Sequence, residues 1–142
     1  MSVVADAARR WVGTPFAHGA SVRGAGCDCL GLLRGVWREV VGPERVTVPP
    51  YAPDWMDRDD RLARGLASAL RSVPSERSLR GGDVLLMRLR DRGPAAHVGI
   101  VSSTAPCATF IHAYSGRGVV ASRLSEPWMR RAVERFEFPL ED

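Results

Sequence analysis

The chain has 142 residues, of which 45% are hydrophobic and 25% charged, so it is long and apolar enough to form one domain with its own core. Its formal net charge is +4 and every basic residue is an arginine. The arginines are scattered and not interleaved with aromatic residues, which favours an ordinary solvated surface, or attraction to an anionic polymer such as cell wall, over nucleic-acid binding. No stretch approaches the roughly 18 apolar residues of a membrane span.

The first residues do not have the pattern of a secretory signal. An acid, Asp6, precedes Arg9 and Arg10, and no long apolar core follows. We therefore expect synthesis in the cytoplasm without export by that route. Residues 6–12 are typical of a short first helix, which Gly13 and the turn after it would end.

The glycine-rich segment 16–26 leads into a cysteine helix that begins near Cys29. Apolar residues then recur at spacings of three and four, which predicts a helix with one buried face. They are Leu32, Leu33, Val36, Trp37 and Val40. Asp28 stands directly before the helix and is expected to cap it. A cysteine among the unpaired N–H groups of a helix N-terminus should have a pKa lowered from about 8.5 into the range of roughly 3.5 to 7.5.

Beyond a proline- and acid-rich connector over residues 49–60, the pattern changes from helix to strand. Residues 59–72 still have a helical spacing of leucines, but the later segments are short, apolar and separated by Gly, Pro and Ser, which predicts strands. These segments are 83–89, 97–102, 109–113, 118–124 and 132–138. Helices followed by strands predict a single α+β domain, residues 1–142, with the cysteine helix packed on a mostly antiparallel sheet.

The three cysteines, Cys27, Cys29 and Cys107, are an odd number, which argues against a disulfide framework. A zinc site is conceivable from three cysteines and three histidines, but the paired ligand spacings are missing, so we expect no metal. Cys27 is expected to be a small buried hydrophobe and Cys107 a loop residue. Connector acids could hold a cation, although a solvated connector is favoured. These acids are Asp54, Asp57, Asp59 and Asp60.

Two histidines could serve a cysteine nucleophile, which needs a nearby base and a group that orients the base. His97 opens the apolar run 97–101, where it can present its ring to the cysteine helix. His112 lies one predicted strand later and could hydrogen-bond the far nitrogen of His97. A cysteine at a helix N-terminus with histidines on successive strands is the geometry of papain-like nucleophilic catalysis.

The order of these motifs resembles that of the NlpC-type cysteine peptidases, the papain-like cell-wall hydrolases. The resemblance extends over residues 5–124 and rests on several short motifs. They are residues 11–16, 26–32, 82–85, 97–100 and 111–113. The segment from Thr14 to Gly31 is similar to the cysteine loop of small peptidases encoded in phage-tail and gene-transfer-agent clusters.

The resemblance implies a papain-like NlpC fold with Cys29 as nucleophile, His97 as base and His112 as the residue that orients it. It implies peptidoglycan stem peptides as substrates, with no metal or organic cofactor. The family often has a tyrosine near the position of Phe16, and phenylalanine cannot donate a hydrogen bond. His18 or a backbone N–H could then substitute in the oxyanion hole. We expect Phe16, His18 and Asp28 to lie at the substrate or oxyanion side of the site.

Our leading hypothesis is a peptidoglycan endopeptidase carried by a phage-like tail, with tail hub or baseplate proteins as partners. One alternative is a structural tail component that has the fold but little activity, which the missing tyrosine at Phe16 favours. Another is an amidase or acyltransferase on the same scaffold, because such enzymes use the same residues. Tyr51 and Trp55 of the connector could line the substrate cleft or anchor a partner protein.

Overall fold

The computed structural model describes residues 2–48, 50–51, 60–90 and 92–140, which form four helices and eight short strands. The helices are α1 (Val3–Arg9), α2 (Cys29–Val40), α3 (Arg61–Ala69) and α4 (Glu126–Arg131). The strands are β1 (Ser21–Val22), β2 (Gly26–Cys27), β3 (Arg71–Ser72), β4 (Val84–Met87), β5 (His97–Ser103), β6 (Thr109–Tyr114), β7 (Gly118–Arg123) and β8 (Ala132–Glu137). Of these described helices, none is long and apolar enough to cross a membrane.

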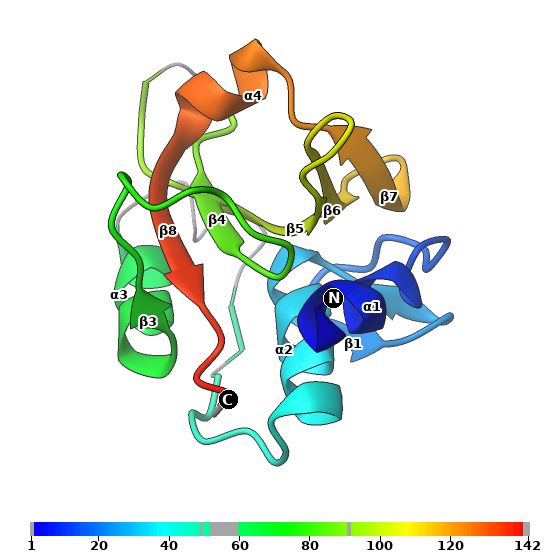
Figure 1. Cartoon of the computed structure of the whole chain (residues 1–142). Coiled ribbons are helices and arrows are strands. Elements are labelled where there is room, and N and C mark those ends of the chain that lie inside the picture. Colours follow the sequence, from blue (N-terminus) through cyan, green and yellow to red (C-terminus); the bar gives the residue numbers. More distant parts are fainter. Residues whose placement is uncertain (1, 49, 52–59, 91, 141–142) are drawn as a thin grey trace.

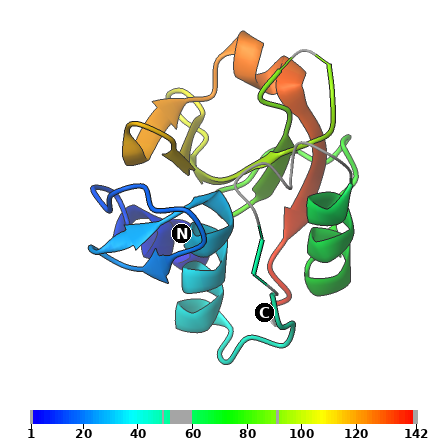
Figure 2. The ribbon, with the colours of Figure 1, turned by 180° about the vertical axis from the view of Figure 1, so that it is seen from behind.

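A six-stranded sheet organises the domain, with the strand order β3-β8-β4-β5-β6-β7. All of its strand pairings are antiparallel. Helices α1 and α2 pack on each other and on β5, while α3 lies near the β3 and β8 end of the sheet (Figure 1). The view from behind shows the same separation of α2 from α3 (Figure 2). The predicted α+β architecture is confirmed.

Apolar side chains cover both faces of the central strands, β4 and β5. On one face, Leu32 and Val36 of α2 join Ile100 and Ile111 in the main core. On the other face a smaller cluster forms around Phe110, which is fully buried. Strands covered on both faces appear in sequence as continuous apolar runs rather than alternating ones.

The structure corrects several predicted boundaries. The helix predicted over residues 6–12 begins earlier, at Val3, because the hydroxyl of Ser2 caps it by accepting a hydrogen bond from the N–H of Ala5 at 3.1 Å. The predicted helix 59–72 is α3, which is shorter; residues 71–72 form β3 instead, paired with β8. The five longer predicted strands are present, with ends that differ by up to two residues. Strands β1 to β3 and helix α4 were not predicted.

Part of the connector lies outside the described residues. The residues concerned are Asp54, Trp55, Asp57 and Asp59, so the roles predicted for them lie outside the described residues. Tyr51 and Asp60 are described. Asp60 precedes α3 and pairs with Arg64 at 3.1 Å on the exposed face of that helix.

Close backbone contact explains why glycine stands at position 31 of α2. A Cβ atom there would lie 1.8 Å from the carbonyl oxygen of Ala20, which is backbone and cannot rotate away. The hydroxyl of Ser21 donates to the carbonyl of Gly31 at 2.6 Å, so the preceding loop presses directly on the first turn of the helix. The missing side chain is what lets the loop set the position of the cysteine helix.

We expect Gly31→Ala to lower the free energy of unfolding by about 1–3 kcal/mol, the usual cost of overpacking. The matched control is Gly65→Ala in the middle of α3, where no described atom lies within 4 Å of an added Cβ. That variant should gain roughly 0.5–1 kcal/mol through helix propensity. Urea denaturation of both variants checks the pair, and equal effects would contradict the proposed contact.

Candidate active site

Cys29 is the first residue of α2, and the residue is only 5% exposed. The backbone N–H groups of Val98, Leu30 and Cys29 itself lie near enough to the thiol to lower its pKa. Val98 follows His97 directly in β5, so the sulfur faces the beginning of that strand. The fold thus brings the helix N-terminus to the histidine strand, as the sequence predicted.

The prediction of a lowered cysteine pKa is wrong for the protein without substrate. Burial of the thiol raises the pKa of Cys29 to about 12, and the carboxylate of Asp28 raises it further. The backbone hydrogen bonds act in the opposite direction but do not outweigh desolvation. The thiol is therefore protonated at neutral pH, and a base must remove its proton when the sulfur reacts.

His97 and His112 form a buried hydrogen-bonded pair. The Nε2 atom of His97 lies 2.8 Å from Nδ1 of His112, and the two rings meet edge to face at 76°. His97 is 3% exposed and His112 only 1%. His112 therefore contacts the far nitrogen of His97, in the geometry that the sequence suggested, and Nδ1 of His97 is the ring nitrogen left to receive a proton.

Both imidazoles are neutral at physiological pH. Burial lowers the pKa of His97 to about 3, with a further contribution from His112. Burial also lowers the pKa of His112 to about 4. A neutral imidazole has one N–H and one lone pair, so His97 can act as a base if the lone pair is on Nδ1.

Trp128 of α4 covers the histidine pair, a role that the sequence gave no reason to expect. Its ring centroid lies 6.0 Å from that of His97, 5.3 Å from that of His112 and 5.3 Å from that of Phe110. The guanidinium of Arg131 stacks over the indole, 5.9 Å from the ring centroid. The short helix α4 lies between β7 and β8 (Figure 1), and its Trp128 side chain packs against both histidine rings.

Asp28 ties three segments together beside the thiol. Its carboxylate accepts hydrogen bonds from the N–H groups of Gly31 and Gly19, both at 2.7 Å, and from the hydroxyl of Tyr51. The first of these bonds is the predicted N-cap of α2. Burial raises the pKa of Tyr51, as do its hydrogen bond to Asp28 and the nearby Cys29. A tyrosine hydroxyl therefore lies near the nucleophile position, but it comes from the connector and not from position 16.

His18 and Phe16, two of the residues expected at the substrate or oxyanion side of the site, both lie in or next to the loop that precedes α2. The Nε2 atom of His18 lies 2.8 Å from the carbonyl oxygen of Tyr51, and its ring meets the tyrosine ring edge to face. Phe16 is 36% exposed and bridges to the backbone of Cys27. Cys27 is fully buried in the main core, as predicted. His18 thus holds the connector against the loop that precedes α2.

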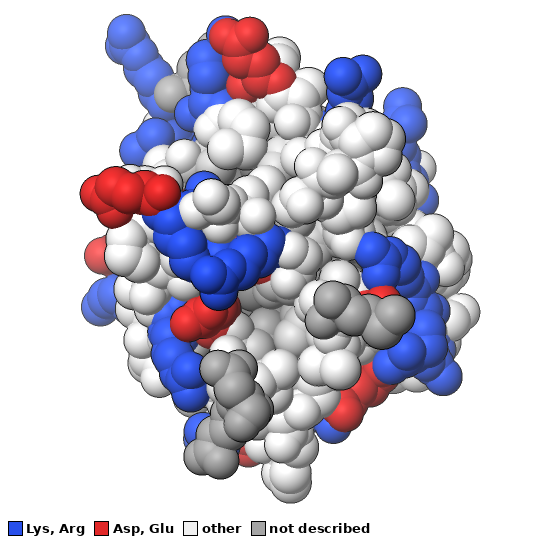
Figure 3. All heavy atoms as spheres, viewed as in Figure 1, with Lys and Arg blue, Asp and Glu red and all other residues white. Residues whose placement is uncertain are grey.

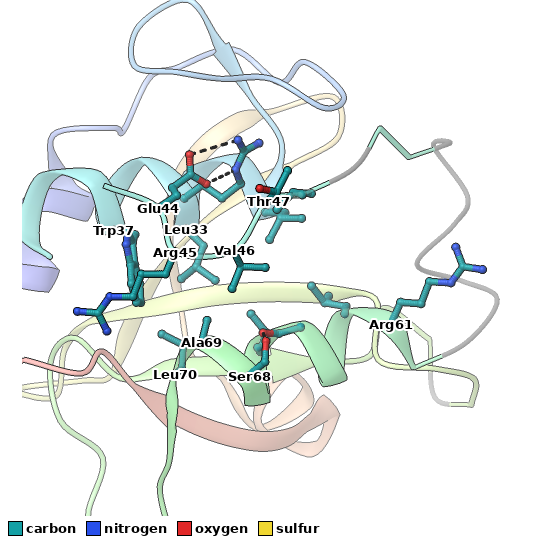
Figure 4. A pocket seen from close by; sticks show the side chains of 16 residues that line it. Leu33, Trp37, Glu44, Arg45, Val46, Thr47, Arg61, Ser68, Ala69 and Leu70 are labelled. Atoms are coloured by element: carbon teal, nitrogen blue, oxygen red, sulfur yellow. Dashed lines mark hydrogen bonds and ion pairs between the residues drawn. The ribbon is translucent and has the colours of Figure 1, made fainter. Parts of the chain in front are cut away.

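A pocket with a volume of about 370 Å³ lies between α2 and α3 (Figure 4). Its walls are mainly apolar side chains such as Leu33, Trp37 and Leu66, and an ion pair between Arg34 and Glu44 borders it at 2.6 Å. Neither Cys29 nor either buried histidine lines this pocket. It is a feature of helix packing and not of the thiol's surroundings.

Charged side chains are dispersed over the surface. On the face in Figure 3, arginines form several separate groups with acidic side chains between them. Some are paired, such as Arg10 with Glu39 at 3.0 Å. No group of three or more potential metal ligands occurs among the described residues.

A buried cysteine at a helix N-terminus, beside a hydrogen-bonded histidine pair on an antiparallel sheet, is typical of papain-like thiol hydrolases. The NlpC/P60 family model matches residues 13–137, and the chain therefore belongs to the NlpC/P60 family. The resemblance to NlpC-type peptidases that was inferred from the sequence is confirmed as membership of this family.

Two curated relatives come from Escherichia coli. The chain is 28% identical to murein DD-endopeptidase MepS/murein LD-carboxypeptidase over 134 residues, which are 94% of this chain and 60% of the relative. It is also 28% identical to murein DD-endopeptidase MepH over 122 residues, which are 84% of this chain and 39% of that protein. The chain thus spans less than two thirds of the length of each of these relatives.

Two solved structures share the fold. The NlpC/P60 domain of the peptidoglycan hydrolase SagA superposes with a TM-score of 0.59 at 20% identity, over 96% of this chain and 97% of that one. A lipoprotein-like NLP/P60 protein of Staphylococcus aureus gives a TM-score of 0.63 at 21% identity, over 98% of this chain and 41% of that one. At this identity the likeness concerns the fold alone.

The position of Trp128 predicts how the histidine pair responds to pH. Trp128→Ala should raise the pKa values of His97 and His112 toward 6.5, because water then reaches the rings. NMR titration of the imidazole resonances measures this directly. Met129→Ala, a change at an exposed residue of the same helix, should leave both values unaltered and serves as the control.

The lowered pKa values of His97 and His112 also make the stability of the folded protein depend on pH. In the unfolded chain a histidine takes up a proton below about pH 6.5, whereas these two stay neutral in the folded protein until about pH 3 to 4. The free energy of unfolding should therefore fall as the pH decreases through this window. In Trp128→Ala the fall should be smaller, and an identical pH dependence in both proteins would contradict the shielding role.

Proposed function

We propose that this protein is a cysteine endopeptidase that cleaves the stem peptides of peptidoglycan through an acyl-enzyme on Cys29. The main observation behind the proposal is that the Cys29 thiol lies near the start of β5. This strand begins with His97, which is hydrogen-bonded to His112. The names of the two E. coli relatives, both murein endopeptidases, supply the substrate class.

The reaction begins with transfer of the thiol proton to Nδ1 of His97, because the thiol and the imidazole are both neutral before substrate binds. The sulfur attacks the amide carbonyl and forms a tetrahedral oxyanion. The N–H groups of Cys29 and Leu30, which reach the sulfur, are placed to stabilise that oxyanion. This arrangement needs no side-chain donor at position 16.

Collapse of the tetrahedral intermediate breaks the amide bond. His97 returns its proton to the leaving amine, and a thioester with Cys29 remains. His97 then removes a proton from water, which attacks the thioester and releases the carboxylate product with the thiol restored. His112 holds the imidazole of His97 in position throughout both steps.

The test is mass spectrometry of purified muropeptides after incubation with the protein. We expect wild type to release cleaved stem peptides and Cys29→Ala to release none above background, because the thiol that forms the proposed acyl-enzyme is removed. His97→Ala should lose about 10²- to 10⁴-fold, the usual contribution of general acid–base catalysis. His112→Ala should retain more activity than His97→Ala, because its base is misaligned but present.

Cys107→Ala is the matched control, since Cys107 lies in the half-buried loop between β5 and β6. It should have wild-type activity. Hydrolysis by Cys29→Ala at the wild-type rate would exclude the acyl-enzyme mechanism. Turnover of His97→Ala equal to that of wild type would exclude His97 as the base.

We further propose that the peptidase acts as part of a phage-like tail, bound to hub or baseplate proteins. The support is the similarity of the segment from Thr14 to Gly31 to the cysteine loop of small peptidases from tail and gene-transfer-agent clusters. Tyr51, at the described edge of the connector, is half-buried against His18 and is one candidate for this contact.

Mass spectrometry of purified particles from the producing organism tests this association. We expect peptides of this chain in intact particles at a few copies per tail. Its absence from particles, together with abundance in the cell lysate, would refute the association while leaving the endopeptidase proposal untouched.

A further inference from the structure

The histidine pair continues to a third polar side chain, Ser122. The Nε2 atom of His112 lies 2.8 Å from the hydroxyl oxygen of Ser122. Together with the 2.8 Å contact between His97 and His112, this forms one continuous line of hydrogen bonds that ends at a half-buried hydroxyl.

Strand register explains why these groups meet. His112 of β6 lies opposite Val120 of β7, so Ser122 is its diagonal neighbour on the same face of the sheet. Phe110, directly opposite Ser122, stacks on His112 with the ring centroids 4.2 Å apart. Packing therefore fixes the plane of the His112 ring and aims its outer nitrogen at the hydroxyl.

The contact matters because only one arrangement of protons makes His97 a base. Nδ1 of His97 has a lone pair only if the ring's N–H is on Nε2 and donates to Nδ1 of His112. His112 must then carry its own proton on Nε2 and donate it to the oxygen of Ser122. In the opposite arrangement Ser122 donates to His112, His112 donates to His97, and Nδ1 of His97 is already protonated.

We infer that Ser122 is a positioning residue of the active site, which accepts a hydrogen bond from His112 and so selects the tautomer that leaves Nδ1 of His97 free to take the thiol proton. A hydroxyl can accept this bond while donating its own hydrogen elsewhere. Ser122 is only half-buried, so water can receive that hydrogen. The assignment of a catalytic effect rests on the proposed peptidase function, whereas the assignment of the tautomer does not.

The experiment compares Ser122→Ala with Ser122→Thr, which keeps the hydroxyl and suits a strand position. Ser125→Ala is the control, because Ser125 precedes α4 and its side chain does not cap that helix. The first readout is the tautomer of His112, measured by ¹⁵N NMR of the imidazole ring without substrate. We expect the Nε2–H form in wild type, Ser122→Thr and Ser125→Ala, and a substantial Nδ1–H population in Ser122→Ala.

The second readout is muropeptide hydrolysis. Loss of one neutral hydrogen bond should lower kcat of Ser122→Ala by about 3- to 10-fold with KM unchanged, and Ser122→Thr should recover most of the loss. An Nδ1–H tautomer in wild type, or an Nε2–H form that persists in Ser122→Ala, would overturn the inference. Failure of wild type to hydrolyse muropeptides would instead count against the proposed function, because the NMR result does not depend on it.

Discussion

The carboxylate of Asp28 is the interaction on which the proposed site depends. A buried charge is costly unless it is fully hydrogen-bonded, and Asp28, at 2% exposure, receives donors from the loop at Gly19, from α2 at Gly31 and from Tyr51 of the connector. Removing any of these segments would leave the charge undersatisfied. The first turn of α2 is thus locked to the loop before it, and the cysteine one residue later can occupy only one place.

The charge of Asp28 also disfavours ionisation of Cys29, the residue that it positions. Asp28 raises the pKa of Cys29, in addition to the larger effect of burial, so the helix N-terminus does not produce a thiolate in the resting protein. Placement of the sulfur and ionisation of the sulfur are therefore separate problems in this fold. Asp28 serves the first, and in the proposed mechanism the second is left to His97 of β5.

A helix or strand was predictable where its own residues form a long pattern of apolar and polar side chains. The spacing of apolar residues in α2 and the cap at Asp28 were sufficient to locate the cysteine helix, and continuous apolar runs located the central strands. Strands β1 and β2 have two residues each, too few for any periodicity, and β3 exists only because β8 returns to pair with it. Helix α4 has no buried residues, so it has no apolar face that a sequence pattern could reveal.

The site was predictable where chemistry demands particular residue types, which singled out Cys29, His97 and His112. The groups around them were not predictable. Ser122 reaches the pair through strand register, and Trp128 reaches it from helix α4 between β7 and β8. Ser122 and Trp128 nonetheless both affect the protonation of the His97–His112 pair. Burial keeps both the thiol and the imidazoles neutral. In the mechanism proposed above, charge therefore arises only when a substrate carbonyl accepts the sulfur. The backbone N–H groups of α2 would then stabilise the oxyanion, and the tautomer of the histidine pair would decide whether the proton can leave the thiol.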